Sequence, residues 1–222
     1  MSSFKLDWKQ IDTVLLDMDG TILDLYFDNF FWQEYLPMCW GEQHGLDKES
    51  AKRKLVPRFK SKEGTLSWYC LDYWAHELDI DVLKLKSDVE DLIQVRPQAL
   101  NFMTTLISMG KQLIMVTNAH PDLIAMKLER TGIGDYFNHI ICAHDLGSAK
   151  EHIEFWSRLN EKVPYSVKNT ILIDDNITVL RAARDYGITY LLSIAKPDSR
   201  APIRDSEEFV SIENFNDVLS GY

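Results

Sequence analysis

The chain has 222 residues, of which 45% are hydrophobic, and a formal net charge of −10. This length suits one compact domain, or a core domain that carries a smaller insert. The acidic balance argues against nucleic acids and anionic membranes as partners, because like charges repel. A small anionic substrate stays compatible with this charge if a lysine or a bound metal lies beside it.

The cysteines and the apolar segments indicate the compartment. Cys39, Cys70 and Cys142 are few, odd in number and far apart, and neither they nor the six histidines show zinc-ligand spacing. We therefore expect free thiols in a reducing compartment and no histidine-bound metal. The first residues lack an apolar signal region, and no apolar run approaches the roughly 20 residues that span a bilayer. The predicted location is the cytoplasm, and no pattern indicates an obligate protein partner.

The first predicted strand is the short apolar, partly β-branched run at residues 13–16 (TVLL), which ends in Asp17. Residues 24–95 differ from it, because they have helical periodicity and are rich in aromatic side chains. A proline and two glycines divide this stretch into several expected helices. Trp68 and Asp72 are four residues apart, so we expect them to share one helix face.

From Pro97 onward the predicted helices alternate with strands. Pro97 suits a first helical turn, after which Leu100, Met103 and Ile107 form one apolar face. Further strands are expected at residues 113–116, 140–141, 170–173 and 190–192, with helices that start at Pro121, after Lys150 and around Val179. This alternation predicts a Rossmann-like α/β core with a parallel sheet, whose ligands lie beyond the carboxyl ends of the strands.

The segment from Asp17 to Thr21 (DMDGT) directly follows the first predicted strand. One carboxylate can attack phosphorus as a nucleophile, and a second, on Asp19, can protonate the leaving oxygen and later activate water. Two carboxylates beside a phosphate dianion need a cation, and Mg²⁺ prefers oxygen ligands. The pattern indicates magnesium-dependent phosphoryl transfer, with a calcium-binding or turn-forming acidic loop as the alternative.

Three further polar segments each follow a later strand. Thr117 and Asn118 stand ahead of a helix start, where a hydroxyl and an amide can cradle phosphate, although either could simply cap the helix. Lys150 can offset charge on a nucleophile and a phosphate, although a loop lysine is ordinarily a surface residue. Asp174 ends a buried strand, where a carboxylate without a cation would be costly, so we expect it to bind metal.

These four motifs resemble the signature motifs of the haloacid dehalogenase (HAD) superfamily, and the resemblance covers the whole chain. It implies that Asp17 is the nucleophile and Asp19 the general acid/base. Thr117 would bind the phosphoryl oxygens, and Lys150 would orient the nucleophile and the phosphate. The resemblance also implies a core domain at residues 1–23 and 96–222, and a helical cap domain at residues 24–95.

The same resemblance implies that Mg²⁺ is held by Asp17, by the main-chain carbonyl of Asp19 and by Asp174, with Asp175 in support. Many members of the superfamily carry a further acidic or amide residue four or five positions after the first aspartate of the last motif. This chain departs from that pattern, because Thr178 and Val179 stand there. The outer coordination shell is therefore less defined than the three main ligands.

The segments LLDMDGTILDLYFDNFFW, LSWYCLDYW, VTNAHP and IDDN are similar to those of bacterial GMP/IMP 5′-nucleotidases of this superfamily. The similarity implies a phosphomonoester substrate, and specifically a purine nucleoside 5′-monophosphate. Asp28, Asn29 and Asp72 are then the polar cap residues to consider for base recognition, beside aromatic rings that either stack on a purine or fill the core of the cap.

Two other functions stay open at this point. The first is a HAD phosphatase or mutase that acts on a small phosphosugar or another metabolite. The second is a non-catalytic module that binds phosphate or a nucleotide. The pair formed by Asp17 and Asp19 favours an enzyme, because binding alone does not require a general acid/base. Dehalogenases of the superfamily lack the second aspartate, so they are set aside.

Overall fold

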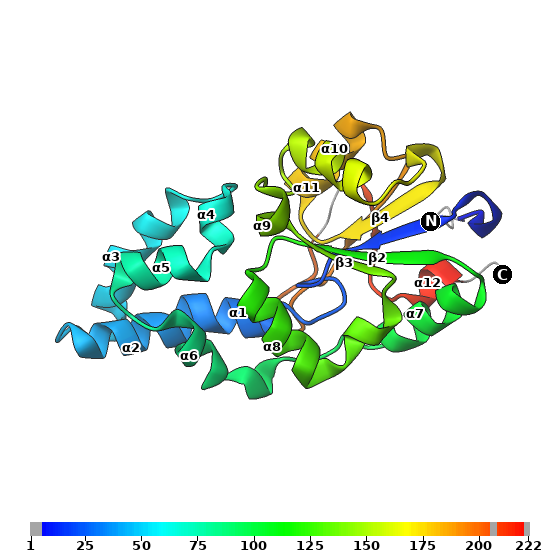
Figure 1. Cartoon of the computed structure of the whole chain (residues 1–222). Coiled ribbons are helices and arrows are strands. Elements are labelled where there is room, and N and C mark those ends of the chain that lie inside the picture. Colours follow the sequence, from blue (N-terminus) through cyan, green and yellow to red (C-terminus); the bar gives the residue numbers. More distant parts are fainter. Residues whose placement is uncertain (1–5, 205–207, 220–222) are drawn as a thin grey trace.

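The computed structural model describes residues 6–204 and 208–219, and it contains a six-stranded sheet with a group of helices beside it (Figure 1). All strand pairs are parallel, in the order β3–β2–β1–β4–β5–β6. The strands are β1 (Thr13–Leu16), β2 (Gln112–Thr117), β3 (His139–Cys142), β4 (Thr170–Asp174), β5 (Tyr190–Ile194) and β6 (Val210–Ile212). The predicted parallel α/β core is therefore confirmed. The strand order changes direction at β1, which is where ligands of such sheets bind.

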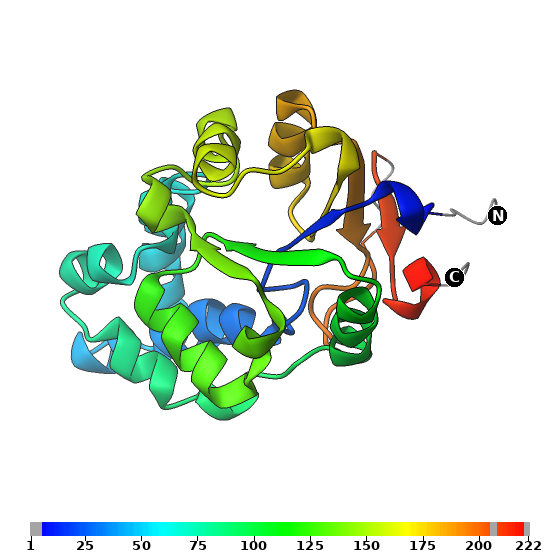
Figure 2. The same ribbon diagram turned by 45° about the vertical axis from the view of Figure 1, so that its right-hand side comes forward.

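Helices cover both faces of this sheet (Figures 1 and 2). On one face lie α7 (Ala99–Ser108) and α8 (Pro121–Thr131), and on the other lie α10 (Ile153–Lys162) and α11 (Ile177–Tyr186). Successive strand residues point to opposite faces, so Val14 and Leu16 join one buried cluster and Leu15 joins the other. The remaining core helices are η1 (Trp8–Gln10), η4 (Ile133–Tyr136), α9 (Ala143–Leu146), η5 (Val167–Asn169) and α12 (Asn216–Leu219).

The apolar face predicted for the helix after Pro97 is wrong in two of its three residues. Met103 is buried, but Leu100 and Ile107 expose 41% and 48% of their surface. The helix starts at Ala99, after Gln98 adopts a left-handed backbone conformation (φ 67°), and Pro97 stands outside it. The buried face consists of Ala99, Phe102, Met103 and Leu106.

Eight short helices between Tyr26 and Leu92 lie beside the carboxyl ends of the strands, and we call them the cap (Figure 1). They are α1 (Tyr26–Phe30), η2 (Phe31–Tyr35, a π-helix), α2 (Leu36–Gln43), α3 (Lys48–Lys60), α4 (Leu66–Tyr69), α5 (Leu71–Leu78), α6 (Val82–Ser87) and η3 (Glu90–Leu92). Trp32, Phe59 and Trp74 pack edge to face, with ring centroids 5.1–6.0 Å apart, so these aromatic side chains form the core of the cap.

Two chain segments connect the cap to the sheet, and they lie side by side. Leu23 forms an antiparallel bridge with Val95. The Arg96 N–H donates to the Ile22 carbonyl at 2.8 Å, and the Asp24 N–H donates to the Gln94 carbonyl at 2.9 Å. The domain boundaries expected at residues 24 and 95 fall at this bridge, and they stay a prediction.

The expected helix through Trp68 and Asp72 is interrupted. Cys70 has an extended backbone (φ −86°, ψ 113°), ends α4 and begins α5, so Trp68 and Asp72 belong to different helices. The Cys70 Sγ accepts a hydrogen bond from the Tyr73 N–H at 3.5 Å and caps α5. Within the described residues, no helix is long and apolar enough to cross a membrane.

Candidate active site

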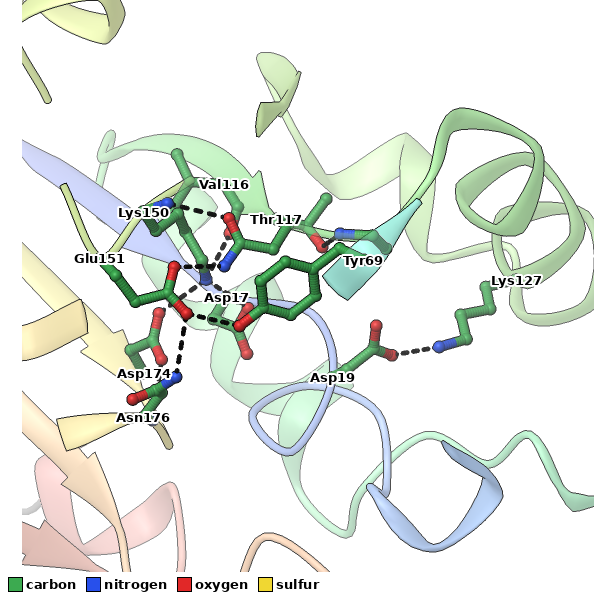
Figure 3. A network of polar contacts seen from close by, with 12 residues as sticks. Asp17, Asp19, Tyr69, Val116, Thr117, Lys127, Lys150, Glu151, Asp174 and Asn176 are labelled. Carbon is green, nitrogen blue, oxygen red and sulfur yellow. Dashed lines mark hydrogen bonds and ion pairs between the residues drawn. The ribbon is translucent and has the colours of Figure 1, made fainter. Parts of the chain in front are cut away.

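The acidic residues of the first and last motifs meet because β1 pairs with β4. Leu16 is in register with Ile173, and the Asp17 N–H donates to the Ile173 carbonyl at 3.1 Å. Each strand ends at this point, so Asp17 and Asp174 leave the sheet side by side (Figure 3). Carboxylate oxygens of Asp17, Asp174 and Asp175 lie within 4.8 Å of one another.

Lys150 is the cation at the centre of this group (Figure 3). Its Nζ donates to Asp17 Oδ1 at 2.6 Å, to Asp174 Oδ2 at 2.7 Å and to the Val116 carbonyl at 3.1 Å. Burial alone would lower the pKa of Lys150, but the two carboxylates outweigh burial and raise it. Lys150 is 2% exposed, so the alternative of an ordinary surface lysine is wrong.

Lys150 and the exposed Arg204, which lies 3.7 Å from Asp175 Oδ2, do not balance the charge of three carboxylates at this buried position. Burial raises the pKa of Asp17 to about 6, with a further contribution from Asp174 and opposition from Lys150. Burial, followed by the charges of Asp17 and Asp174, raises the pKa of Asp175 well above its usual value. Within the described residues, Asp17 Oδ2 is buried without a hydrogen-bond partner. An unpartnered carboxylate oxygen in an all-oxygen donor set fits a hard divalent cation such as Mg²⁺.

Gly20 allows the acidic loops to approach each other this closely. A Cβ atom at this position would lie 2.7 Å from Asp175 Cγ, and the backbone has a positive φ of 86°. Both features disfavour any residue with a side chain. The absence of a side chain at Gly20 therefore makes room for Asp175, 155 positions later in the chain, because the loops after β1 and β4 are in contact.

Thr117 and Asn118 lie where β2 ends, and both are buried. Neither caps α8, because the capping side chain is that of His120, so the alternative of simple helix capping is wrong. Asn118 Oδ1 accepts from the Lys150 N–H at 2.9 Å, which fixes the loop that carries the lysine. Thr117 Oγ1 accepts from the Ala119 N–H at 3.1 Å, which leaves its own hydrogen free to donate.

Glu151 and Tyr69 complete the site, and neither was predicted from the sequence (Figure 3). Glu151 Oε2 accepts from Asn118 Nδ2 at 2.9 Å. Its Oε1 accepts from the Tyr69 hydroxyl at 2.5 Å and from Asn176 Nδ2 at 3.4 Å. Glu151 therefore joins two core loops to α4 of the cap. Glu151 could have been assigned to the site from the sequence, because it directly follows Lys150. Tyr69 could not, because its contact with Glu151 depends on how the cap packs against the core.

Asp19 faces a lysine in the site (Figure 3). Lys127 Nζ, on α8, lies 2.6 Å from Asp19 Oδ1 and 2.6 Å from Asp28 Oδ2. Lys86 Nζ, on α6, lies 2.7 Å from the other oxygen of Asp28. Burial raises the pKa of Asp19 to about 6 against the opposing charge of Lys127. Burial also opposes ionisation of Asp28, but the two lysines outweigh it and lower the pKa of Asp28.

The structure places the three polar cap residues in different settings. Both Asp28 oxygens are engaged by lysines. Asn29 Nδ2 donates to Asp198 Oδ2 at 2.7 Å, and this asparagine also lines the cavity described below. The Asp72 side chain is 84% exposed and lies 3.5 Å from His120 Nε2. No pattern in the sequence indicated that Lys86 and Lys127, which are 0% and 1% exposed, would be buried partners of Asp28.

A cavity of about 550 Å³ lies between the cap and the sheet. Its core lining includes Asp17, Asp19, Thr117, Asn118, Lys150 and Asp174. Its cap lining includes Asn29, Trp32, Gln33, Lys52, Trp68 and Tyr69. The volume is within the range of small-molecule sites, and the acidic centre forms part of the lining. The arrangement can hold a small ligand with an anionic group at the core and a partly aromatic group at the cap.

The sequence profile of the haloacid dehalogenase-like hydrolases matches residues 11–187, which include all four motifs. The chain belongs to this family. The GMP/IMP nucleotidase YrfG of Escherichia coli K12 is 35% identical to this chain over 212 residues, which are 96% of each chain. The protein is accordingly an enzyme of the phosphatase type. YrfG of Shigella flexneri matches to the same extent.

Solved structures of other haloacid dehalogenase-like hydrolases share the fold. A HAD phosphatase of Thermococcus onnurineus superimposes with a TM-score of 0.75 at 21% identity, covering 93% of this chain and 95% of the other. The HAD-hydrolase YfnB of Bacillus subtilis, described as bound to magnesium, gives a TM-score of 0.66 at 17% identity, covering 93% and 96%. At these identities the similarity shows the fold alone.

Proposed function

We propose that the protein hydrolyses a purine nucleoside 5′-monophosphate, with GMP and IMP preferred. The observation that carries the phosphatase chemistry is the buried oxygen of Asp17, a residue that lines the cavity, because this oxygen lacks a hydrogen-bond partner within the described residues. The similarity to the GMP/IMP nucleotidase YrfG supports the choice of substrate. The cavity adds to this support, because its cap lining combines aromatic and amide side chains.

In the proposed reaction, an Asp17 oxygen attacks phosphorus and the bond to the 5′ oxygen breaks. Asp19 gives its proton to that oxygen, and the nucleoside leaves. Water then attacks the phosphorus of the aspartyl-phosphate and Asp19 takes a proton from the water. Inorganic phosphate is released and the Asp17 carboxylate is regenerated. Lys127 engages only Oδ1 of Asp19 in the structure, so Oδ2 is the oxygen proposed to carry the proton to the leaving oxygen.

Lys150 and Thr117 orient the reacting groups in this proposal. Lys150 holds Asp17 Oδ1 at 2.6 Å, which fixes the orientation of the carboxylate that attacks phosphorus. Its ammonium also compensates charge that the phosphoryl group brings into a buried place. Thr117 can donate its hydroxyl hydrogen to a phosphoryl oxygen, and Asn118 retains one amide hydrogen beyond the one used by Glu151.

We propose Mg²⁺ as the cofactor, held by Asp17, by Asp174 and by the main-chain carbonyl of Asp19, with Asp175 in support. The fit rests on the cluster of three carboxylates and on the unpartnered oxygen of Asp17. When bound, the ion would offset the negative charge that these carboxylates and the phosphate bring together.

Base recognition follows from hydrogen-bond patterns. GMP and IMP present a 6-oxo acceptor and a protonated N1, whereas AMP presents a 6-amino donor and a bare N1. A cavity lining matched to the first pattern would face AMP with unpaired, desolvated polar groups. Such a mismatch costs several kcal/mol, or roughly a hundredfold in specificity.

The test is the kcat/KM for phosphate release from GMP, IMP, AMP, UMP and a phosphosugar under the same magnesium concentration. We expect GMP and IMP to exceed AMP by about a hundredfold. Equal values for AMP and GMP would refute base recognition by this pattern. A preference for the phosphosugar would replace the nucleotidase with a sugar phosphatase. Binding of phosphate without turnover of any substrate would indicate a non-catalytic module.

A further inference from the structure

A second group of metal-ligating side chains lies at the seam between the cap and the core, outside the acidic centre. One ligand atom from each of Cys70, Asp72 and His120 lies within 4.8 Å of the others. Cys70 and Asp72 belong to the start of α5 in the cap, whereas His120 stands in the core, directly before α8. The catalytic chemistry proposed above uses none of these three side chains.

The spacing of these atoms is close to that of a metal site. Ligands of a tetrahedral zinc ion stand roughly 3.5 Å apart, given metal–ligand bonds of about 2.0–2.3 Å. His120 Nε2 and Asp72 Oδ2 are already 3.5 Å apart. The Asp72 side chain is 84% exposed, so small rotations about its side-chain bonds can bring its carboxylate to ligand distance from both Cys70 and His120.

The other nitrogen of His120 also has a suitable partner. Nδ1 lies 3.6 Å from Asp122 Oδ2. Histidines that bind metal through one nitrogen commonly donate the other N–H to a carboxylate, which fixes the tautomer and the ring orientation. In the structure Nδ1 accepts a hydrogen bond from the Asp122 N–H at 3.4 Å, so an ion at Nε2 requires the ring proton to move to Nδ1 and turn from this contact to the nearby Asp122 carboxylate. His120 would then present the Nε2 lone pair to the space shared with Cys70 and Asp72. His120 is 8% exposed, so its ring is held in place by packing.

The contacts around the cluster hold its two halves together. Tyr69, the neighbour of Cys70, donates its hydroxyl to Glu151 of the core at 2.5 Å. The Cys70 Sγ is oriented by the Tyr73 N–H. Cys70 therefore has a defined direction on a segment that is attached to the core, which reduces the entropy lost when an ion binds.

We propose that Cys70, Asp72 and His120 form a binding site for a thiophilic divalent cation of the zinc class. A thiolate, a carboxylate and a neutral imidazole together carry two negative charges, which such an ion neutralises, and water can take a fourth position. The thiolate disfavours Mg²⁺, which requires oxygen ligands, so the site and the acidic centre select different ions. The sequence shows no zinc spacing because the ligands come from two segments 50 residues apart.

Because this site lies between the cap and the core, we expect a bound ion to change the enzymatic activity. Two ligands come from the cap and one from the core, so a bound ion joins the two. The cavity lies between the cap and the core, and its lining includes Tyr69, Asn118 and Ala119, which are sequence neighbours of the ligands. Substrate and product have to pass between these parts, and an ion that holds them together slows this exchange. The site would therefore be inhibitory.

The direct test is cobalt absorption, which does not depend on any enzymatic activity. Metal-free protein in excess Mg²⁺ is titrated with Co²⁺, whose bond to a thiolate gives a charge-transfer band in the near ultraviolet. We expect this band in the wild type and in Cys39→Ser, which alters another half-buried cysteine. It should be lost in Cys70→Ser, where the hydroxyl can still cap α5. No band in the wild type, or a band that survives Cys70→Ser, would overturn the proposal.

Inhibition by Zn²⁺ provides the second test, with p-nitrophenyl phosphate as substrate under saturating Mg²⁺. Loss of a ligand should raise the half-inhibitory Zn²⁺ concentration at least tenfold, because loss of even an outer partner costs about 10–100-fold in affinity. Asp72→Asn, on an exposed side chain, gives a variant that keeps the fold if Cys70→Ser does not. Unchanged inhibition in both variants would assign Zn²⁺ to the acidic centre and overturn the proposal. The nucleotide preference plays no part in either test.

Discussion

At the scale of single residues, the electrostatics of the site depend on which carboxylate oxygens are paired with a lysine. Lys150 engages one oxygen of Asp17, and the second oxygen stays buried without a partner in the described part of the chain. Asp19 differs, because Lys127 holds it. Each aspartate of this short motif therefore has a lysine of its own, and burial raises the pKa of both carboxyl groups to about 6.

The nucleophile assignment is tested by Asp17→Asn. The change is nearly isosteric, so the fold should persist, while turnover should fall by more than about a hundredfold, since a covalent nucleophile is worth several kcal/mol. Asp12→Asn is the matched control, because Asp12 precedes the same strand and is exposed. Phosphate release by Asp17→Asn at more than about a hundredth of the wild-type rate would contradict the assignment.

The acid role is tested by Asp19→Asn with two substrates. A nucleotide has a poor leaving group that needs a proton, whereas p-nitrophenol leaves without one. We therefore expect kcat to fall much further for the nucleotide than for p-nitrophenyl phosphate. Equal losses for the two substrates would show that Asp19 does not supply the proton.

At the scale of the elements, α1, α6 and α8 are joined by alternating charges, in which the lysines are buried and the aspartates are partly buried. Lys86, Asp28, Lys127 and Asp19 follow one another at 2.6–2.7 Å. Lys86 Nζ also lies over the rings of Phe27 and Phe31, at 4.7 and 4.3 Å. A buried charge is tolerated only while its partner is present, so each member of this array depends on its neighbours.

Removal of one charge from this array should be costly. Lys86→Met leaves Asp28 with Lys127 alone, and we expect the free energy of unfolding to fall by about 3–5 kcal/mol. Lys84→Met is the matched control on the same helix, because Lys84 is exposed, and it should stay within about 0.5 kcal/mol. Urea denaturation measures both. Equal stabilities of the two variants would show that the array contributes little.

The contact between α4 and the core gives a further prediction. Tyr69→Phe removes the hydroxyl that reaches Glu151, and kcat/KM should fall by roughly three- to tenfold, the equivalent of a hydrogen bond worth about 1 kcal/mol. Tyr73→Phe, on the neighbouring helix, should retain full activity. In Glu151→Gln the Tyr69→Phe change should have a smaller effect, because the two groups act on each other. Additive effects would argue against a direct coupling.

At the scale of the whole molecule, the proposed metal site can form only in the folded sheet. Its carboxylates come from segments that follow β1 and β4, which are distant in the chain and adjacent in the sheet. A chelator should therefore remove activity, and Mg²⁺ should restore it. Calcium should inhibit, because its larger and looser coordination shell positions the reacting groups poorly. Full phosphate release in excess chelator would exclude the proposed cofactor.

Local pattern was sufficient for five of the six described strands and for the order of the motifs. Short apolar runs predicted β1 to β5 to within two residues at either end, because buried parallel strands are apolar throughout, whereas β6 was not predicted. The convergence of Asp17 and Asp174 followed from these strands, since parallel strands bring their carboxyl ends to one edge. The chemistry of the acidic centre is therefore contained in the sequence.

Only the tertiary structure decided which cap residues meet which core residues. The contacts of Asp28 with Lys127, of Tyr69 with Glu151 and of Cys70 with His120 join segments that no local periodicity relates. The orientation of α7 was likewise decided by packing in the core, which buries Ala99, Phe102, Met103 and Leu106 and leaves Leu100 and Ile107 exposed. Strand and motif patterns depend on near neighbours, whereas these pairings depend on how the cap packs against the sheet.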